Sequence, residues 1–180
     1  MTDVTTQQSA QIVQFGAGRV GQTVGDGECF ALADLALRSA GARSAANYGA
    51  VTPGANYVWG RAVTIGQLRA GDVIQFRNYS VTVTTVTKIT QPDGSWTQNT
   101  ETQTMTRPHH TAIASDVGRN GDVVLYEQNV NDARSAMATR LYFTSRREPA
   151  QTTTEDGVTT TVTRTIQVTG TVRFYRPQTP

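Results

Sequence analysis

The chain has 180 residues, of which 37% are hydrophobic and 17% charged, and its formal net charge is +2. This length suits one compact domain, and the low charge content excludes a charge-rich disordered chain or a coiled coil. The basic excess is small and the longest Lys/Arg run has two members, so the composition does not indicate binding to nucleic acid or to a membrane surface.

The beginning of the chain carries an acid and threonines where a signal peptide would carry lysines followed by an apolar stretch. We therefore expect synthesis in the cytoplasm without a signal peptide. The longest apolar stretch, residues 30–37, is broken by Asp34 and is far shorter than the roughly 20 residues that span a bilayer. Membrane insertion is thus not expected, and the chain is predicted to be a soluble monomer.

Two helices are predicted in the N-terminal part. Residues 7–22 have apolar positions at helical spacing, loosened by two glycines. After a glycine-rich turn, the Ala- and Leu-rich residues 29–38 end before Gly41, which predicts a second helix that begins at Cys29. Residues 42–63 are predicted as a loop and residues 64–69 as one helical turn.

Strand patterns dominate the rest of the chain. Five short strands are predicted, the second and third joined by a turn at Asn120-Gly121: residues 73–76, 111–115, 122–127, 140–143 and 171–175. Helices followed by strands predict an α+β fold, with the N-terminal helices packed on an antiparallel β-sheet.

Two threonine-rich segments, residues 79–107 and 148–169, are predicted to interrupt this sheet as β-hairpin insertions. The domain prediction is therefore a single domain over residues 1–180 with two hairpins. The hairpins could be solvated extensions of the sheet, or they could form the walls of a substrate groove or a surface for a partner.

Cys29 is the single cysteine, which excludes an internal disulfide and a multi-cysteine metal site. At a helix N-terminus the dipole and the free N–H groups stabilise a thiolate, and the same N–H groups can receive the oxyanion of an attacked carbonyl. The residue is thus a candidate nucleophile. The alternative is that it is a small buried hydrophobic residue.

The two histidines of the chain, His109 and His110, lie directly before a predicted strand. Because side chains alternate along a strand, at most one of them points toward the cysteine helix. We assign that place to His110, since it begins the strand, whereas His109 follows Pro108 in the incoming loop. A histidine titrates near neutral pH and suits the role of base for the thiol.

The end of the next predicted strand supplies candidate partners for His110. If the two strands pair through the turn between them, the pairing brings Glu127 or Asn129 beside the histidine, on one face, while Gln128 points away. A carboxylate or amide that accepts the imidazole N–H would fix the tautomer. The alternatives are a surface charge for Glu127 and a turn residue for Asn129.

Four motifs together carry a family resemblance: VGDGEC at residues 24–29, LRAGDVIQF at 68–76, HTAIA at 110–114 and EQN at 127–129. Their order and spacing resemble the CHAP group of the NlpC/P60-type, papain-like cysteine peptidases and amidases. The resemblance covers residues 10–130, and neither threonine-rich hairpin has a counterpart in it.

This resemblance implies a papain-like fold in which Cys29 is the nucleophile, His110 the general base and then acid, and Glu127 with Asn129 orient the imidazolium. It also implies cleavage of an amide bond in bacterial peptidoglycan, by an amidase or an endopeptidase. One departure is Glu28, where the family commonly has glutamine. A carboxylate at that position would disfavour the thiolate if it pointed inward.

Four residues near these motifs are predicted to bind substrate: Gln22, Glu28, Trp59 and His109, with Gln22 as a candidate second oxyanion donor. A phage lysin or a secretion-delivered antibacterial effector, acting at the cell wall or periplasm after delivery or lysis, would fit. Its partners would be peptidoglycan and an immunity protein or a secretion or phage component. The alternatives are a cysteine protease or deamidase with a protein substrate, and a catalytically degenerate binding or structural module.

No cofactor and no metal ion are predicted. Residues 16–21 match the dinucleotide pattern G-x-G-x-x-G, but Gly25 and Gly27 interrupt the helix that should follow, and no βαβ unit fits. The two adjacent histidines would face opposite sides of a strand, which does not suit a metal site.

Overall fold

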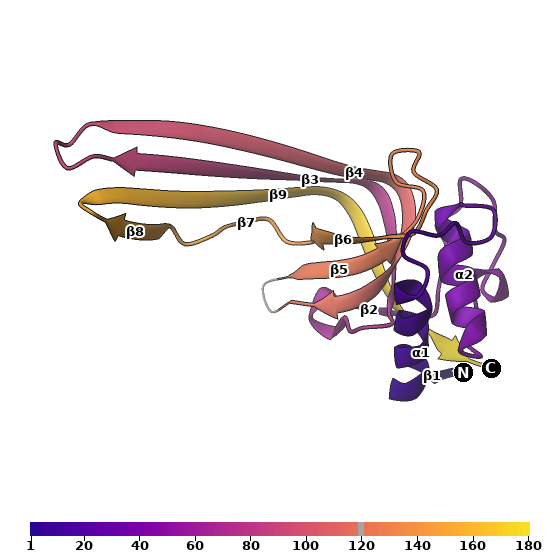
Figure 1. Ribbon diagram of the computed structural model, residues 1–180. Helices are drawn as coiled ribbons and strands as arrows, with labels where there is room; N and C mark the ends of the chain where they lie inside the picture. The colour runs from indigo at the N-terminus through magenta and orange to yellow at the C-terminus, as the bar shows by residue number, and fades with distance from the viewer. Residues whose placement is uncertain (119–120) are drawn as a thin grey trace.

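The computed structural model describes residues 1–118 and 121–180. Two helices, α1 (Thr6–Ala17) and α2 (Cys29–Ser39), lie at one end of the molecule against an antiparallel sheet (Figure 1). The 3₁₀ turns are Ala45–Asn47 and Ile65–Gln67. The strands are β1 (Thr2–Asp3), β2 (Arg61–Val63), β3 (Val73–Thr90), β4 (Trp96–Val117), β5 (Asp122–Glu127), β6 (Met137–Tyr142), β7 (Arg146–Arg147), β8 (Gln151–Glu155), β9 (Val158–Arg176) and β10 (Gln178–Thr179). The predicted α+β class is confirmed.

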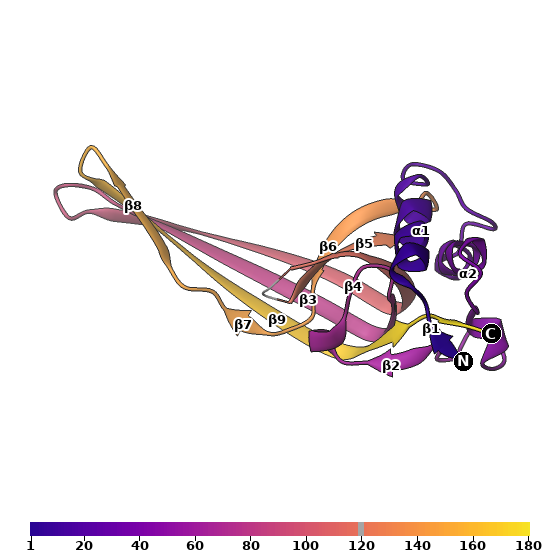
Figure 2. The same cartoon turned by 90° about the horizontal axis from the view of Figure 1, so that it is seen from below.

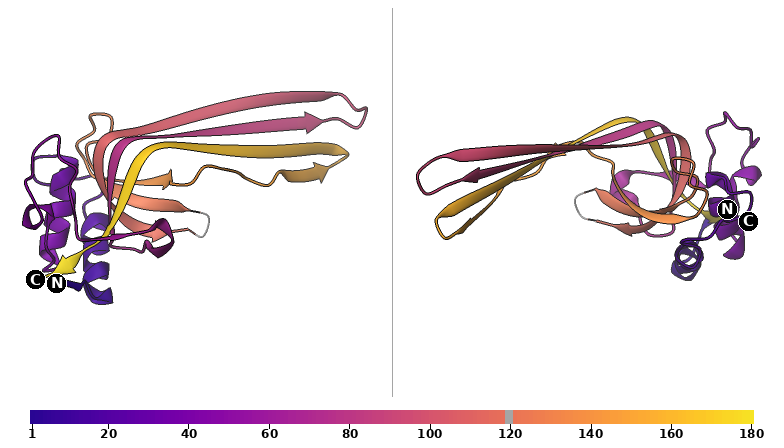
Figure 3. Two further views of the ribbon diagram at one scale, coloured as in Figure 1. Left: turned by 180° about the vertical axis from the view of Figure 1, so that it is seen from behind. Right: turned by 45° about the horizontal axis from the view of Figure 1, so that its top comes forward.

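The main sheet has the strand order β2-β9-β3-β4-β5-β6, and β7 and β8 also pair with β9. All these pairings are antiparallel. Strands β1 and β10 form a separate pair, which brings the two ends of the chain together (Figure 3). Strand β9, which comes near the end of the chain, lies between β2 and β3, which come much earlier.

Helix α1 is shorter than the predicted residues 7–22, because it ends at Ala17. It begins with a capping box, in which Thr5 and Gln8 exchange side-chain-to-backbone hydrogen bonds. Gly16 lies within it and packs on Tyr126, and an added Cβ would come within 2.6 Å of the ring. Gly18 then caps the helix, so the glycines set its end and its close approach to the sheet.

Two apolar clusters cover the two faces of the sheet. Helix α2 packs on one face through its buried residues, which repeat at helical spacing: Leu32, Ala33, Ala36 and Leu37. The second cluster lies on the other face and is built from strand residues, including Ile74, Phe76, Leu125 and Leu141. Neighbouring residues of one strand thus belong to different clusters, as alternation requires.

The two threonine-rich segments form the predicted β-hairpins, β3–β4 and β8–β9, and these extend the sheet instead of interrupting it. Each predicted short strand at residues 73–76, 111–115 and 171–175 is the base of a much longer strand, β3, β4 or β9. The two hairpins also pair with each other, since β9 runs beside β3 from Tyr175 to Thr159. They therefore form one twisted arm that projects from the domain (Figures 1 and 2). The predicted turn at Asn120 lies outside the described residues.

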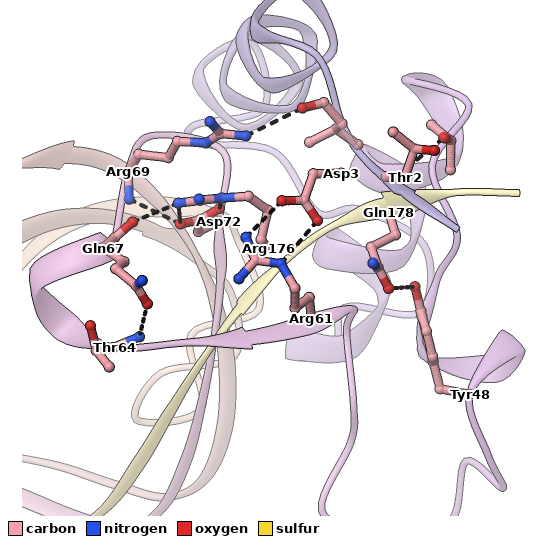
Figure 4. A network of polar contacts seen from close by, with 12 residues as sticks. Thr2, Asp3, Tyr48, Arg61, Thr64, Gln67, Arg69, Asp72, Arg176 and Gln178 are labelled. Carbon is pink, nitrogen blue, oxygen red and sulfur yellow. Dashed lines mark hydrogen bonds and ion pairs between the residues drawn. The ribbon is translucent and has the colours of Figure 1, made fainter.

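A polar network ties the chain ends to the sheet (Figure 4). Arg176 on β9 makes two hydrogen bonds to the buried carboxylate of Asp72, of 3.1 and 2.9 Å, and a third to the carbonyl of Gln67. Arg69 donates to the carbonyl of Val4 at 3.2 Å, also from the turn before β3. This turn therefore holds both the N-terminal segment and the last long strand.

Candidate active site

Cys29 is the first residue of α2, as predicted, and is partly exposed. The loop before it is held by Gln128, which is fully buried directly after β5. The Gln128 amide accepts from the backbone N–H of Val24 at 2.8 Å and donates to the carbonyls of Val24 and Glu28, each at 2.9 Å. Gln128 thus binds the loop before Cys29 and positions the start of the cysteine helix.

His110 lies on β4 opposite Phe76 of β3 and faces the thiol of Cys29. Its Nε2 is 3.1 Å from Oε2 of Glu127, an ion-pair contact that is not aligned as a hydrogen bond. Burial alone would lower the pKa of His110, but its contacts with Cys29 and Glu127 outweigh burial and raise it. The geometry therefore favours an imidazolium beside the thiol.

Glu127 ends β5 and is completely buried, with Ala112 of β4 as its register partner. Its two oxygens accept hydrogen bonds from Nε and Nη2 of Arg107, at 2.8 and 2.5 Å. Burial raises the pKa of Glu127, but Arg107 and His110 together lower it from 4.5 to about 2. The carboxylate is therefore ionised wherever the protein is folded near neutral pH.

Arg107 was missed by the sequence analysis for a geometric reason. Strict alternation would put a residue three positions before His110 on the opposite face of β4. However, the register shifts where β3 and β9 pair between Arg77 and Ser80, and Asn78 has a positive φ of 51°. The register between β3 and β4 itself is continuous, with Tyr79 opposite Arg107 and Phe76 opposite His110. Arg107 nevertheless lies on the same side of β4 as His110, because both side chains contact Glu127.

A cavity of about 390 Å³ opens in front of Cys29. Its walls come from the loop before α2, from the loop at residues 51–57 and from β4, and the side chains on them include Asp26, Phe30, Val51, Pro53, Tyr57, His109, His110 and Asn129. The lining combines apolar and aromatic side chains with two carboxylates and an amide, so the cavity offers both apolar and polar contacts to a ligand.

Glu28 and Asn129 both line this cavity and bind each other. The Asn129 amide donates to Oε2 of Glu28 at 2.7 Å, and Arg134 contacts the other carboxylate oxygen at 2.9 Å. Asn129 does not continue the alternation of β5, because that strand ends at Glu127 and Asn129 has a φ of 60°. Its amide is thus bound to Glu28 rather than to His110, and the charge of Glu28 is balanced by Arg134.

His109 lies on the cavity wall, as its assignment to the substrate site requires. Its Nε2 is 2.8 Å from the carbonyl oxygen of Ala55, and its ring centroid is 5.3 Å from that of Tyr57. Burial is the main reason that the pKa of His109 is lowered, despite the contact with the Ala55 carbonyl. A neutral His109 therefore joins the 51–57 loop to β4.

Two of the predicted substrate contacts lie away from the cavity. Trp59 is fully buried in the core, and its indole N–H donates to Gln75 at 3.0 Å, so its ring is not accessible to a ligand. Gln22 lines a different cavity of about 570 Å³, between α1 and α2, and its amide nitrogen bonds to the carbonyl of Gly18. The structure gives neither residue a position from which to contact a group bound at Cys29.

Among residues 1–118 and 121–180, no cluster of three His, Cys, Asp or Glu side chains could hold a metal ion. In the same described part of the chain, no helix has the length and apolar character needed to cross a membrane.

A thiol at a helix N-terminus, facing a histidine and a buried carboxylate on an antiparallel sheet, is the arrangement of the cysteine proteinase folds. Residues 1–147 match the family described as AIM3/BBC1 Cysteine proteinase-fold domain, and the chain belongs to this family. The expected papain-like fold is thereby confirmed at this level, while the narrower CHAP resemblance stays a prediction. No curated protein and no solved structure matches the chain.

Proposed function

We propose that the protein is a cysteine-dependent amide hydrolase. The observation that carries this proposal is the alignment of Cys29, His110 and Glu127, in which a buried, ionised carboxylate contacts a histidine that faces a thiol at a helix N-terminus. Cys29 is the proposed nucleophile, and His110 is the general base and then the acid. Glu127 is the proposed orienting group, while Asn129 helps to hold the cavity wall through Glu28.

In the proposed reaction the Cys29 thiolate attacks the carbonyl carbon of an amide and forms a C–S bond. The backbone N–H of Cys29, at the start of α2, is available to the resulting oxyanion. His110 transfers its proton to the amide nitrogen, the C–N bond breaks, and the amine leaves. Water then attacks the thioester and gives up a proton to His110, the C–S bond breaks, and the carboxylic acid leaves, which restores the Cys29 thiolate and the His110 imidazolium.

The proposed substrate is peptidoglycan, cut either between the glycan and the stem peptide or within the peptide. The four motifs shared with CHAP enzymes support this choice. The protein would then act at the cell wall or periplasm after delivery or lysis, as a phage lysin or a secretion-delivered effector with an immunity protein in the producer. The family's description as a cysteine proteinase fold favours a second candidate, a protein substrate.

The test is digestion of purified peptidoglycan sacculi by the wild type and by Cys29→Ala, with mass spectrometry of the released fragments. Ser39→Ala, at the other end of the same helix, is the matched control and should retain activity. We expect fragments from the wild type and the control only, and their termini identify the cleaved bond. Fragment release by Cys29→Ala would refute the mechanism. If no protein releases fragments while Cys29 still reacts with an electrophilic peptide probe, the substrate is a protein and the peptidoglycan assignment is wrong.

A further inference from the structure

Arg107 is a buried charged group at the site, and the proposed mechanism leaves it without a role. It is 4% exposed, and its guanidinium makes hydrogen bonds to both oxygens of Glu127 and to the carbonyl of Thr106. Burying an ion pair costs desolvation energy, which a neutral pair of similar volume would avoid. The arrangement therefore calls for an explanation beyond stability.

The contacts of a single oxygen suggest that explanation. Oε2 of Glu127 lies 2.8 Å from Nε of Arg107 and 3.1 Å from Nε2 of His110. The arginine and the histidine thus share one carboxylate oxygen, while the other oxygen belongs to Arg107 alone. Because a guanidinium binds a carboxylate through two parallel bonds, it fixes the orientation of the group as well as its charge.

We propose that Arg107 is a positioning residue of the cysteine–histidine site: it holds the Glu127 carboxylate against His110 and limits the negative charge that the imidazolium meets. This inference rests on the proposed function, in which His110 must first hold a proton and then release it. A carboxylate without Arg107 would bind the imidazolium more strongly. His110 would then be a weaker acid toward the leaving amine.

The other charged and titratable groups around His110 leave this role to Arg107. Cys29 faces it from α2, and Tyr79 lies beside the pair on β3, with its hydroxyl donated to the carbonyl of Tyr142. At the cavity, His109 is on the adjacent position of β4, and Asp26 and Glu28 are among the lining residues, where Arg134 pairs with Glu28. Besides His110 itself, Arg107 is a cation in direct contact with Glu127.

The measurement is an NMR titration of the histidine ring protons, which is simple because the chain has two histidines. In Arg107→Met we expect the midpoint of His110 to rise by about one pH unit, the scale of a close charge effect. His109, whose ring contacts Ala55 and Tyr57, should keep its midpoint and serves as an internal reference. The matched control is Arg140→Met, which removes an exposed arginine from Asp122 at the other end of β5.

An unchanged His110 midpoint in folded Arg107→Met, judged by near-UV circular dichroism, would overturn the proposal. If that variant does not fold, Arg107→Lys decides the matter. The ammonium keeps the charge but cannot bind both oxygens, so a smaller rise in the midpoint is expected, and no rise counts against the role. The titration needs no substrate, so it can fail or succeed independently of the peptidoglycan digestion.

Discussion

Two buried ion pairs of this molecule each join an arginine to a carboxylate, but the pKa of the acid is shifted in opposite directions in the two pairs. In each, one guanidinium binds both oxygens of a buried carboxylate: Arg176 binds Asp72, and Arg107 binds Glu127. Burial raises the pKa of Asp72 more than Arg176 and the N–H of Arg69 lower it. The pKa of Glu127 falls to about 2, because Arg107 and His110 together outweigh burial. The Glu127 pair differs from the Asp72 pair in that a histidine contacts the carboxylate in addition to the arginine.

The largest expected effects come from neutralising each acid in turn. Glu127→Gln and Asp72→Asn each leave a buried guanidinium without its counter-ion, so each should lower the free energy of unfolding by roughly 3–5 kcal/mol. Only Glu127→Gln should also lower kcat, by about 10²-fold or more, because only Glu127 contacts His110. Urea denaturation and hydrolysis assays measure the two effects. Equal kcat values for the two variants would show that the pairs do not differ in function.

The two acids should also respond to pH with opposite signs. Glu127 has a lowered pKa in the folded state, so its contribution is present above pH 4.5 and is lost as the pH falls toward 2, about 3 kcal/mol in all. Asp72 has a raised pKa, so it makes the protein less stable as the pH rises from 3.8 through its folded pKa.

Urea denaturation at a series of acidic pH values can separate these contributions. Compared with wild type, Glu127→Gln should show a shallower loss of stability toward low pH, and Asp72→Asn a steeper gain as the pH rises from 3.8. Parallel profiles for the wild type and both variants would contradict the different electrostatics of the two pairs.

The smallest effect is expected at an exposed pair in the same network as Asp72. Arg61 binds Asp3 at 3.2 and 2.6 Å, and their side chains are 46% and 33% exposed (Figure 4). Solvent screens such a pair, so Arg61→Met should lower the free energy of unfolding far less than Asp72→Asn and leave kcat unchanged. Thermal unfolding can measure this loss of stability. A loss as large as that of Asp72→Asn would mean that burial does not explain why the Arg176–Asp72 pair contributes more than the Arg61–Asp3 pair.

Much of the local structure was predictable from the sequence. The first residue of α2 and both ends of β5 agree with the predicted elements, because an Ala/Leu-rich run after a glycine turn and a short alternating run after a turn are strong local signals. These two elements, with the histidine strand, are also those that bring Cys29, His110 and Glu127 together. The prediction that Glu127 lies beside His110 followed from the pairing of their two strands alone.

Other predictions failed where alternation or local composition was the only guide. Asn129 binds Glu28 because the chain leaves the strand after Glu127, and Trp59 is a core residue because its N–H finds Gln75 inside the protein. Both threonine-rich hairpins were predicted correctly, but their pairing with each other was not. Their pairing into one arm joins residues about 80 positions apart, for which a single sequence carries no local signal.

By itself, the sequence determined the class of fold, the helix that begins at Cys29 and the strand that ends at Glu127, since these depend on short-range patterns of apolar and turn residues. His110 lies within a strand rather than at its start, because β4 already begins at Trp96. Tertiary structure alone decided that Arg107 holds the carboxylate and that Gln128 holds the loop before the thiol. Arg107 departs from the alternation expected along β4, and Gln128 follows the end of β5, so periodicity predicts neither contact.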